Sequence, residues 1–221
     1  MRQRLWYFRN VTHSITRALL SLSLTTTILV VGCSAPAAPP TPTSALPQGI
    51  TAIDPPIVLK DFSFLNQDSL PVGLKDWMGK LTLVTFGYTH CPDVCPINLA
   101  KFKQVKLALK DTAAQVNFVF VSVDGARDTP DVLKNHLRLF DPSIVGLTSD
   151  DVATRALATQ FGVGYKLEKA TPDQKDYSVT HTASSFLVDR EGRLARLYSY
   201  DLKFDAIAAD IQQMLLTDKS G

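Results

Sequence analysis

Two cysteines, Cys91 and Cys95, offer the most distinctive chemistry in this sequence. They follow the apolar run 81–88, which predicts a buried strand that breaks into a loop. The helix-compatible stretch 97–110 comes next, with Pro96 suited to the first helical position, so both thiols should lie at a helix N-terminus. Because the unpaired N–H groups and the dipole of such a terminus favour a thiolate, this position predicts thiols with a lowered pKa.

The pair permits several kinds of chemistry. In an oxidising compartment it can be a disulfide, a redox couple or part of a metal site. Two thiolates suit Cu(I) or zinc better than magnesium or calcium, but two ligands rarely make a stable site, so a metal would need a third. A plain disulfide would close only a short ring and add little constraint. A thiol peroxidase using Thr89 and Arg127 is a more distant alternative that the spacing does not require.

Three histidines are candidates for the third ligand. His136 lies within a predicted helix and favours a packing or surface role. His90 adjoins Cys91, so the backbone tends to point the two side chains apart. His181 stands where the polar segment 165–180 enters a predicted strand. On the residues alone, a lone histidine there is more often structural than a ligand.

The chain resembles the Sco/SenC family of copper-binding, thioredoxin-fold proteins. The resemblance extends over about residues 55–216, and the matching segments are Phe86–Pro96, Val121–Asp124, Arg127–Pro130, Val145–Thr148 and Asp176–Thr182. It implies that Cys91, Cys95 and His181 bind copper and that the two cysteines cycle between dithiol and disulfide. It also implies that the domain assists assembly of the copper centre of cytochrome c oxidase.

The sequence departs from the family pattern in two places. Thr180 stands where the family usually has Asp immediately before the histidine, and Gly125-Ala126 replaces the family's Pro-Glu. A carboxylate beside His181 would orient the imidazole or raise its pKa, and this chain lacks it. Asp124, at the end of a predicted central strand, is either a neighbour of the site or only a turn former. His90 and Thr180 are the other candidate neighbours.

Residues 1–32 predict a signal peptide. The first 17 residues contain four arginines and no acid, and Ala18–Val31 supplies 14 apolar and small hydroxylated residues. Gly32-Cys33 resembles the lipobox of bacterial lipoproteins, in which the cysteine is lipidated and becomes the mature N-terminus. An uncleaved signal anchor is the alternative. Either one places the domain at the extracytoplasmic face of the bacterial cell membrane.

Residues 33–50 are rich in Pro, Ala, Ser and Thr, which predicts an extended tether. Residues 51–221 are predicted to form one domain, which the resemblance implies binds copper. Without residues 1–32, the chain has 19 basic and 21 acidic residues, so no basic surface indicates a nucleic-acid partner.

The domain is predicted to belong to the α/β class. Its expected strands are 57–64, 81–88, 116–123, 145–147, 182–188 and 193–198, and its expected helices are 97–110, 128–140, 149–161 and 204–216. With the resemblance, this order predicts a thioredoxin-like fold: a central mixed β-sheet flanked by helices, with a C-terminal β-hairpin and helix.

Together these features predict a membrane-tethered copper chaperone rather than an enzyme. Its partner would be the copper-site subunit of cytochrome c oxidase or another copper acceptor. The alternative is an extracytoplasmic thiol–disulfide oxidoreductase that reduces partner cysteines, because thiols at a helix N-terminus suit exchange through a mixed disulfide.

Overall fold

The computed structural model describes residues 46–171 and 173–217. The predicted signal peptide, Cys33 and most of the predicted tether lie outside these residues, so those assignments stay predictions. Among the described residues, no helix has the length and apolar character needed to cross a bilayer.

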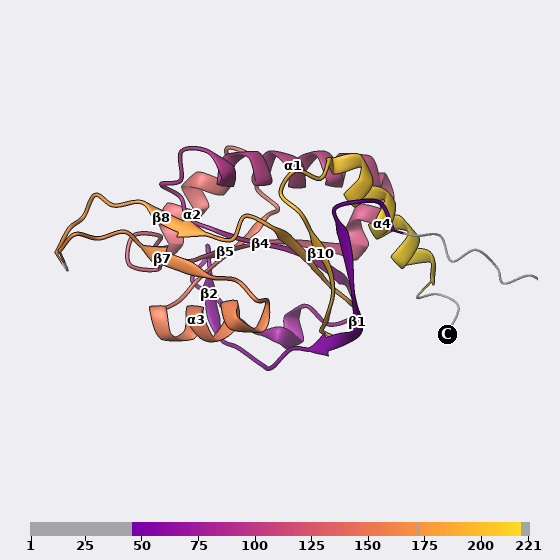
Figure 1. Ribbon diagram of the computed structural model, residues 1–221, viewed down its shortest axis with the longest axis horizontal. Coiled ribbons are helices and arrows are strands. Elements are labelled where there is room, and N and C mark those ends of the chain that lie inside the picture. The colour runs from indigo at the N-terminus through magenta and orange to yellow at the C-terminus, as the bar shows by residue number, and fades with distance from the viewer. Residues whose placement is uncertain (1–45, 172, 218–221) are drawn as a thin grey trace, which may run out of the picture. The chain divides into compact units, whose positions relative to one another are not determined.

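A mixed sheet of eight strands forms the centre of the domain, in the order β1-β10-β9-β4-β5-β6-β2-β3 (Figure 1). The strands are β1 (Ile50–Val58), β2 (Phe64–Asn66), β3 (Pro71–Val72), β4 (Leu81–Gly87), β5 (Val116–Ser122), β6 (Val145–Thr148), β9 (Ser185–Val188) and β10 (Arg193–Tyr198). Strands β4, β5 and β6 are parallel, and β9 pairs antiparallel with β4. The sequences of β4 and β5 are nearly continuous apolar runs because helices cover both faces of the parallel part of the sheet.

Helices cover both faces of this sheet. α1 (Val94–Leu109), α2 (Pro130–Leu137) and α4 (Phe204–Thr217) lie on one face and α3 (Asp151–Gln160) lies on the other (Figure 1). Two short 3₁₀ helices, Leu74–Asp76 and Lys110–Gln115, complete the described helices. The predicted mixed sheet flanked by helices, with a C-terminal hairpin and helix, is confirmed.

The starts of α2 and α3 follow from local sequence. Thr129 caps α2 ahead of Pro130, and its side chain accepts a hydrogen bond from the Val132 N–H. Asp150 caps α3, accepting from the Ala153 N–H at 2.8 Å. Both caps satisfy N–H groups that have no partner within the helix.

Helix α1 begins at Val94, two residues before the predicted first helical residue, Pro96. Pro96 is therefore its third residue rather than its first, and Cys95 lies inside the first turn. Proline is accepted there because the N–H groups of a first helical turn have no intrahelical partner to lose. Helix α2 ends at Leu137 rather than near Phe140, and a turn follows it.

A second, two-stranded sheet projects from the domain and contains β7 (Tyr165–Leu167) and β8 (Val179–His181). Figure 1 shows this hairpin extending past the end of the central sheet. Tyr165 is paired directly with His181. The predicted strand 182–188 is thus wrong at its start, because His181 ends β8 and β9 begins only at Ser185.

Candidate metal centre

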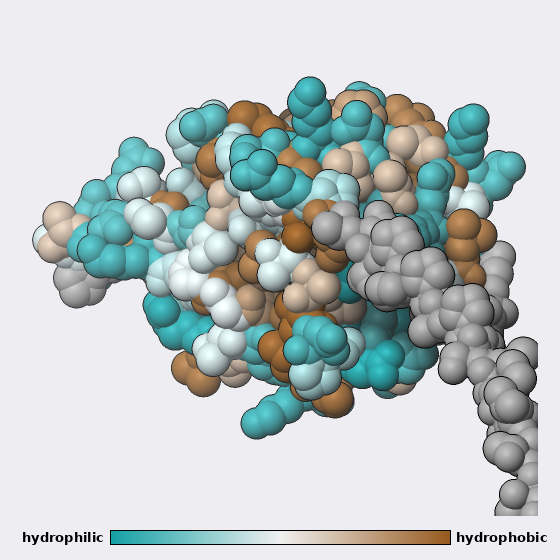
Figure 2. All heavy atoms as spheres, turned by 45° about the vertical axis from the view of Figure 1, so that its right-hand side comes forward, coloured by the Kyte–Doolittle hydropathy of each residue, from teal (hydrophilic) through white to brown (hydrophobic). Residues whose placement is uncertain are grey.

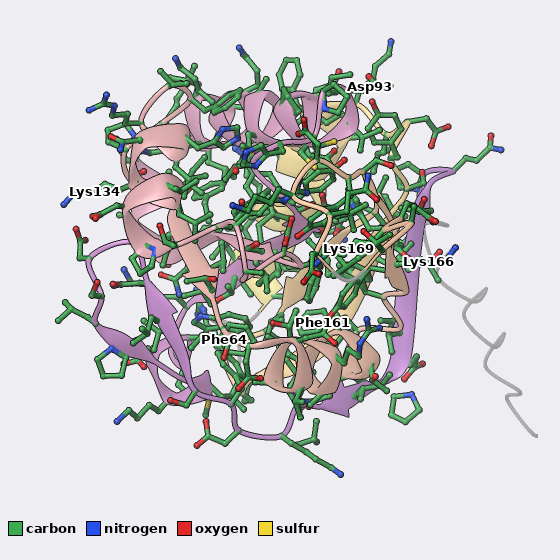
Figure 3. All side chains as sticks on the ribbon, turned by 90° about the vertical axis from the view of Figure 1, so that its left-hand side faces the viewer. Phe64, Asp93, Lys134, Phe161, Lys166 and Lys169 are labelled. Atoms are coloured by element: carbon green, nitrogen blue, oxygen red, sulfur yellow. The ribbon has the colours of Figure 1, made fainter. Side chains whose placement is uncertain are left out.

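The structure brings Cys91, Cys95 and His181 together. Cys91 lies in the loop after β4, Cys95 in the first turn of α1, and His181 at the end of β8. The two Sγ atoms and a ring nitrogen of His181 all lie within 4.8 Å of one another. In the described part of the chain, no other three His, Cys, Asp or Glu residues are grouped closely enough to hold a metal ion. Figure 3 views the molecule from the side of the projecting hairpin and marks Asp93 just before α1.

The end of β4 determines where the sulfur atoms of Cys91 and Cys95 lie. The Cys91 N–H donates to the Tyr88 carbonyl at 3.2 Å, which closes the turn after the strand. A Cβ atom on Gly87 would lie 2.7 Å from Cys95 Sγ and 2.9 Å from the Phe120 ring. The space that Cys95 Sγ occupies therefore exists only because residue 87 has no side chain.

Burial governs the Cys95 thiol. The residue is 1% exposed, and loss of hydration raises the pKa of Cys95 well above its ordinary value. The neighbouring Cys91 thiol and the Asp128 carboxylate add to the rise. The prediction of a lowered pKa at the helix N-terminus is thus wrong for Cys95. Removing a thiolate from water costs more free energy than its attraction to the helix N-terminus contributes. Both cysteines are free thiols in the structure.

His181 presents one nitrogen to the thiols. Its Nδ1 lies 3.0 Å from the Thr182 carbonyl oxygen, so this nitrogen is the donor. The unprotonated Nε2 then faces Cys95 Sγ at 3.3 Å. Burial also lowers the pKa of His181, which favours the neutral imidazole that a metal requires. The Tyr88 ring lies edge-on to the imidazole, 6.0 Å between centroids.

Contacts on the C-terminal side of His181 fix the connection to β9. The Thr182 N–H donates to the Gly164 carbonyl at 3.0 Å. Asn98, a buried residue of α1, donates its amide to the Ala183 carbonyl at 2.9 Å. Sequence reasoning missed Asn98, although a buried amide within an apolar helix is itself a signal of such a hydrogen bond.

The donor set fits a soft metal ion. Two thiols and a neutral imidazole favour Cu(I) or zinc over the hard ions magnesium and calcium. Because burial raises the pKa of Cys95, metal binding at this sulfur would release a proton. A surface pocket of about 430 Å³ is lined by His181 and its neighbours in the hairpin, and neither cysteine lines it. A larger pocket, of about 650 Å³ at the ends of β5 and β6, contains none of the three residues.

The three candidate neighbours have different places. The His90 side chain is 53% exposed, and its Nδ1 contacts Thr89 Oγ1 at 3.1 Å. Thr180 is exposed and precedes His181 in a strand, so the two side chains point to opposite faces. The buried Asp124 carboxylate receives hydrogen bonds from Arg127 Nε at 2.5 Å and the Tyr177 hydroxyl at 2.6 Å. None of these three belongs to the ligand group.

The remaining candidates from the sequence lie apart from the thiols or are engaged elsewhere. His136 packs against the rings of Phe120 and Phe140. Thr89, considered for a peroxidase, donates its hydroxyl to Asp128 at 2.6 Å. Arg127, its suggested partner, is bound to Asp124.

Comparison with known proteins gives consistent results. The SCO1/SenC family model matches residues 51–216. A SCO2-like protein of Rickettsia felis is 30% identical over 141 residues, which cover 64% of this chain and 69% of that protein. Bradyrhizobium japonicum ScoI, solved with copper bound, is 37% identical with a TM-score of 0.64, covering 71% of this chain and 99% of that one.

A further solved structure is a SCO1/SenC family lipoprotein from Bacillus anthracis, 26% identical with a TM-score of 0.65. The match covers 77% of this chain and 99% of that one. With a family model that spans nearly the whole described domain and these structural neighbours, this chain belongs to the SCO1/SenC family.

Proposed function

We propose that this protein binds copper through Cys91, Cys95 and His181 and passes it on during assembly of the copper centre of cytochrome c oxidase. The observation that carries the proposal is the approach of three soft or borderline donor atoms to within 4.8 Å of one another. The copper-bound structure of Bradyrhizobium japonicum ScoI supports the choice of copper.

The position of the site favours a cargo ion over a permanent cofactor. Cys91 is 8% exposed, His181 is partly exposed, and a pocket opens beside the histidine. A partner's thiolates can therefore approach one side of the ion while Cys95 holds it from the buried side. Sequential exchange of soft ligands needs such an accessible face.

We further propose that the domain is tethered at the extracytoplasmic face of the membrane through a lipid on Cys33. The lipobox-like Gly32-Cys33 supports this, as does the lipoprotein from Bacillus anthracis among the relatives. Mass spectrometry of the mature protein should find the lipid on Cys33 as the first residue. An intact Met1 would contradict it.

Copper titration of the reduced protein tests the ligand set. With Cu(I) buffered by a chromophoric chelator, the wild type should bind one copper ion per chain. The variants Cys91→Ser and His181→Ala should each bind at least about a hundredfold more weakly, because the free energy of the site is shared among few ligands. His90→Ala is the matched control and should bind like the wild type. Unchanged affinity in His181→Ala would overturn the three-ligand site.

A thiol–disulfide exchange role is the second candidate, favoured by the two free thiols side by side at the start of α1. Reduction of a partner's disulfide would oxidise Cys91 and Cys95 to a disulfide through a mixed disulfide, transferring two electrons and two protons. Turnover of an oxidised copper-site peptide by the metal-free protein would support this role. No turnover at any redox poise would exclude it.

A further inference from the structure

The hairpin that carries His181 packs against the core through Val179, which is buried, and through Tyr165, Leu167 and Tyr177, which are partly buried. It projects beyond the sheet (Figure 1) and carries mainly hydrophilic side chains (Figure 2). Apolar packing is not directional, so directed polar contacts are needed to fix where the backbone of the hairpin lies. The polar contacts just before β8 come from one group of side chains around the buried Asp124 carboxylate.

That group is the triad of Asp124, Arg127 and Tyr177, which we call the inner triad. Asp124 and Arg127 belong to the loop after β5, and Tyr177 lies two residues before β8. The Arg127 guanidinium lies 3.6 Å from the centre of the Tyr177 ring and donates to the Tyr177 carbonyl at 2.9 Å. Together with the bonds to the Asp124 carboxylate, these contacts fix both the side chain and the backbone of residue 177.

The inner triad also reaches the imidazole from a second direction. The Arg127 guanidinium lies 5.7 Å from the centre of the Tyr88 ring. Tyr88 is the residue whose ring stands edge-on to His181 and whose carbonyl receives the Cys91 N–H. Arg127 thus contacts both Tyr88, which begins the loop that carries Cys91, and the hairpin that carries His181.

A second triad of the same composition provides an internal comparison. On β7, the Tyr165 hydroxyl donates to Asp151 at 2.8 Å, and Arg155 covers the ring at 4.4 Å while pairing with Asp151 at 2.7 Å. This outer triad is exposed: the Arg155 and Asp151 side chains are 51% and 53% exposed, against 15% and 0% for Arg127 and Asp124. Water screens the outer contacts and hardly reaches the inner ones.

We propose that the inner triad is a positioning device that holds His181 against Cys95 before copper arrives. The triad does not touch the metal. It fixes the strand that ends in His181, so that the third ligand is already in place when the two thiols take up the ion. This inference rests on the proposed copper function and assigns Asp124 a role beyond forming a turn.

The expected effect follows from population arithmetic. If weakening the triad reduces the fraction of molecules with His181 in place to about a tenth, the apparent affinity for copper falls about tenfold. A hydrogen bond to a buried carboxylate is strong enough to shift a hairpin equilibrium by this amount. Removing the exposed hydroxyl of Tyr165 should change the affinity by about twofold or less.

The test compares three tyrosine-to-phenylalanine variants, each of which loses one hydroxyl bonded to a carboxylate. Tyr177→Phe alters the inner triad and Tyr165→Phe alters the outer triad. Tyr198→Phe removes the bond from β10 to Asp210, a buried contact of 2.7 Å apart from the candidate ligands, and serves as the control for general stability. Arg127→Lys is a second alteration of the inner triad that keeps the charge but loses the stacked guanidinium.

Two measurements separate positioning from stability. The first is Cu(I) affinity, together with the nitrogen hyperfine coupling in the electron paramagnetic resonance spectrum of the Cu(II) form. The second is amide hydrogen exchange of β8 in the reduced, metal-free protein. Tyr177→Phe and Arg127→Lys should weaken copper binding about tenfold, reduce the nitrogen coupling and speed exchange in β8. Tyr198→Phe should lower the urea midpoint and leave copper affinity, nitrogen coupling and β8 exchange unchanged.

The positioning role would be overturned if both inner-triad variants had the same copper affinity, nitrogen coupling and β8 exchange as the wild type. An equal loss in Tyr198→Phe would also overturn it, because the effect would then come from stability alone. If the wild type itself bound no copper, the proposed function would fail instead. The β8 exchange rates of the metal-free variants would still decide whether the triad holds the hairpin.

Discussion

At the scale of single residues, the site depends on one absent side chain. Gly87 ends β4 and lies against Cys95 Sγ, which is buried beneath the loop that carries Cys91. The imidazole of His181 completes the group through Nε2, because the Thr182 carbonyl holds Nδ1. Steric fit and one backbone hydrogen bond thus decide where two of the three donor atoms lie.

Gly87→Ala should therefore damage the site without changing a ligand. The added Cβ would lie within 3 Å of both Cys95 Sγ and the Phe120 ring, a clash that packed interiors relieve at a cost of about 1–3 kcal/mol. Urea unfolding should show this loss, and copper affinity should fall with it. Gly164→Ala is the control, since an added Cβ there meets no atom within 4 Å. Wild-type stability in Gly87→Ala would show that the sulfur can move freely.

At the scale of elements, the helix that carries Cys95 has an unusual start. Asp93 caps α1 with φ −134° and ψ −82° and makes no side-chain hydrogen bond to the first turn. Asp150 caps α3 with an extended backbone and a hydrogen bond to Ala153 N–H. The N–H groups at the start of α1 therefore lack the usual carboxylate partner beside the metal centre.

The two caps should differ in their contribution to stability. Asp150→Ala should lower the free energy of unfolding by about 1 kcal/mol, because it removes a cap hydrogen bond. Asp93→Ala should lower it by only about 0.3–0.5 kcal/mol, because only the attraction to the helix dipole is lost. Urea unfolding of the reduced, metal-free variants measures both. Equal losses would contradict this account, because they would show that the Asp93 side chain accepts a cap hydrogen bond in solution.

The elements also show what the sequence could and could not predict. The strands β4 and β5 and the helices α2 and α3 follow from local patterns, and all four were predicted. Strand β1 was missed over most of its length because Pro55 and Pro56 interrupt it, and the pairing with β10 shifts register between Ala52 and Ile57. Its hydrogen-bond partner lies far along the chain, where no local pattern can indicate it.

The candidate site was likewise predictable from the sequence only in part. The resemblance indicated all three candidate ligands, and the cysteine spacing alone indicated two of them. The boundary between β8 and β9 was missed because Val179–Leu187 contains no turn signal, and only pairing with different partners separates the strands. The role inferred for Asp124 depends on Tyr177, which is distant in sequence, so the choice between a turn former and a neighbour of the site required the fold.

At the scale of the whole molecule, the polar contacts at the two ends of the sheet serve different purposes. The inner triad lies at the end where β4 and β5 give way to loops, beside the metal centre. At the opposite end, Lys106 of α1 pairs with Asp141 at 2.8 Å, just before β6. This pair contributes to stability and lies apart from the metal centre, so it reports on the fold alone.

The pair predicts a pH dependence of stability. Burial alone would raise the pKa of Asp141, but hydrogen bonds from Lys106 and Ser143 outweigh it and lower the pKa below the ordinary value of 3.8. The unfolded chain then binds the proton more tightly, so the contribution is present above pH 3.8 and is lost as pH falls through the folded pKa. Asp141→Asn should cost about 0.5–1 kcal/mol near neutral pH, and the difference from the wild type should shrink below that pKa. If the free energies of unfolding of Asp141→Asn and the wild type differed equally at neutral pH and below the folded pKa, this would contradict the ion pair.

The central claim is that two sulfur atoms and one imidazole nitrogen bind copper together. X-ray absorption spectroscopy of the reduced protein loaded with one equivalent of Cu(I) tests it directly. The account predicts a first coordination sphere of two sulfur ligands and one nitrogen ligand, with the nitrogen lost in His181→Ala and one sulfur lost in Cys91→Ser. A wild-type spectrum with sulfur ligands alone, or a nitrogen that persists in His181→Ala, would contradict it.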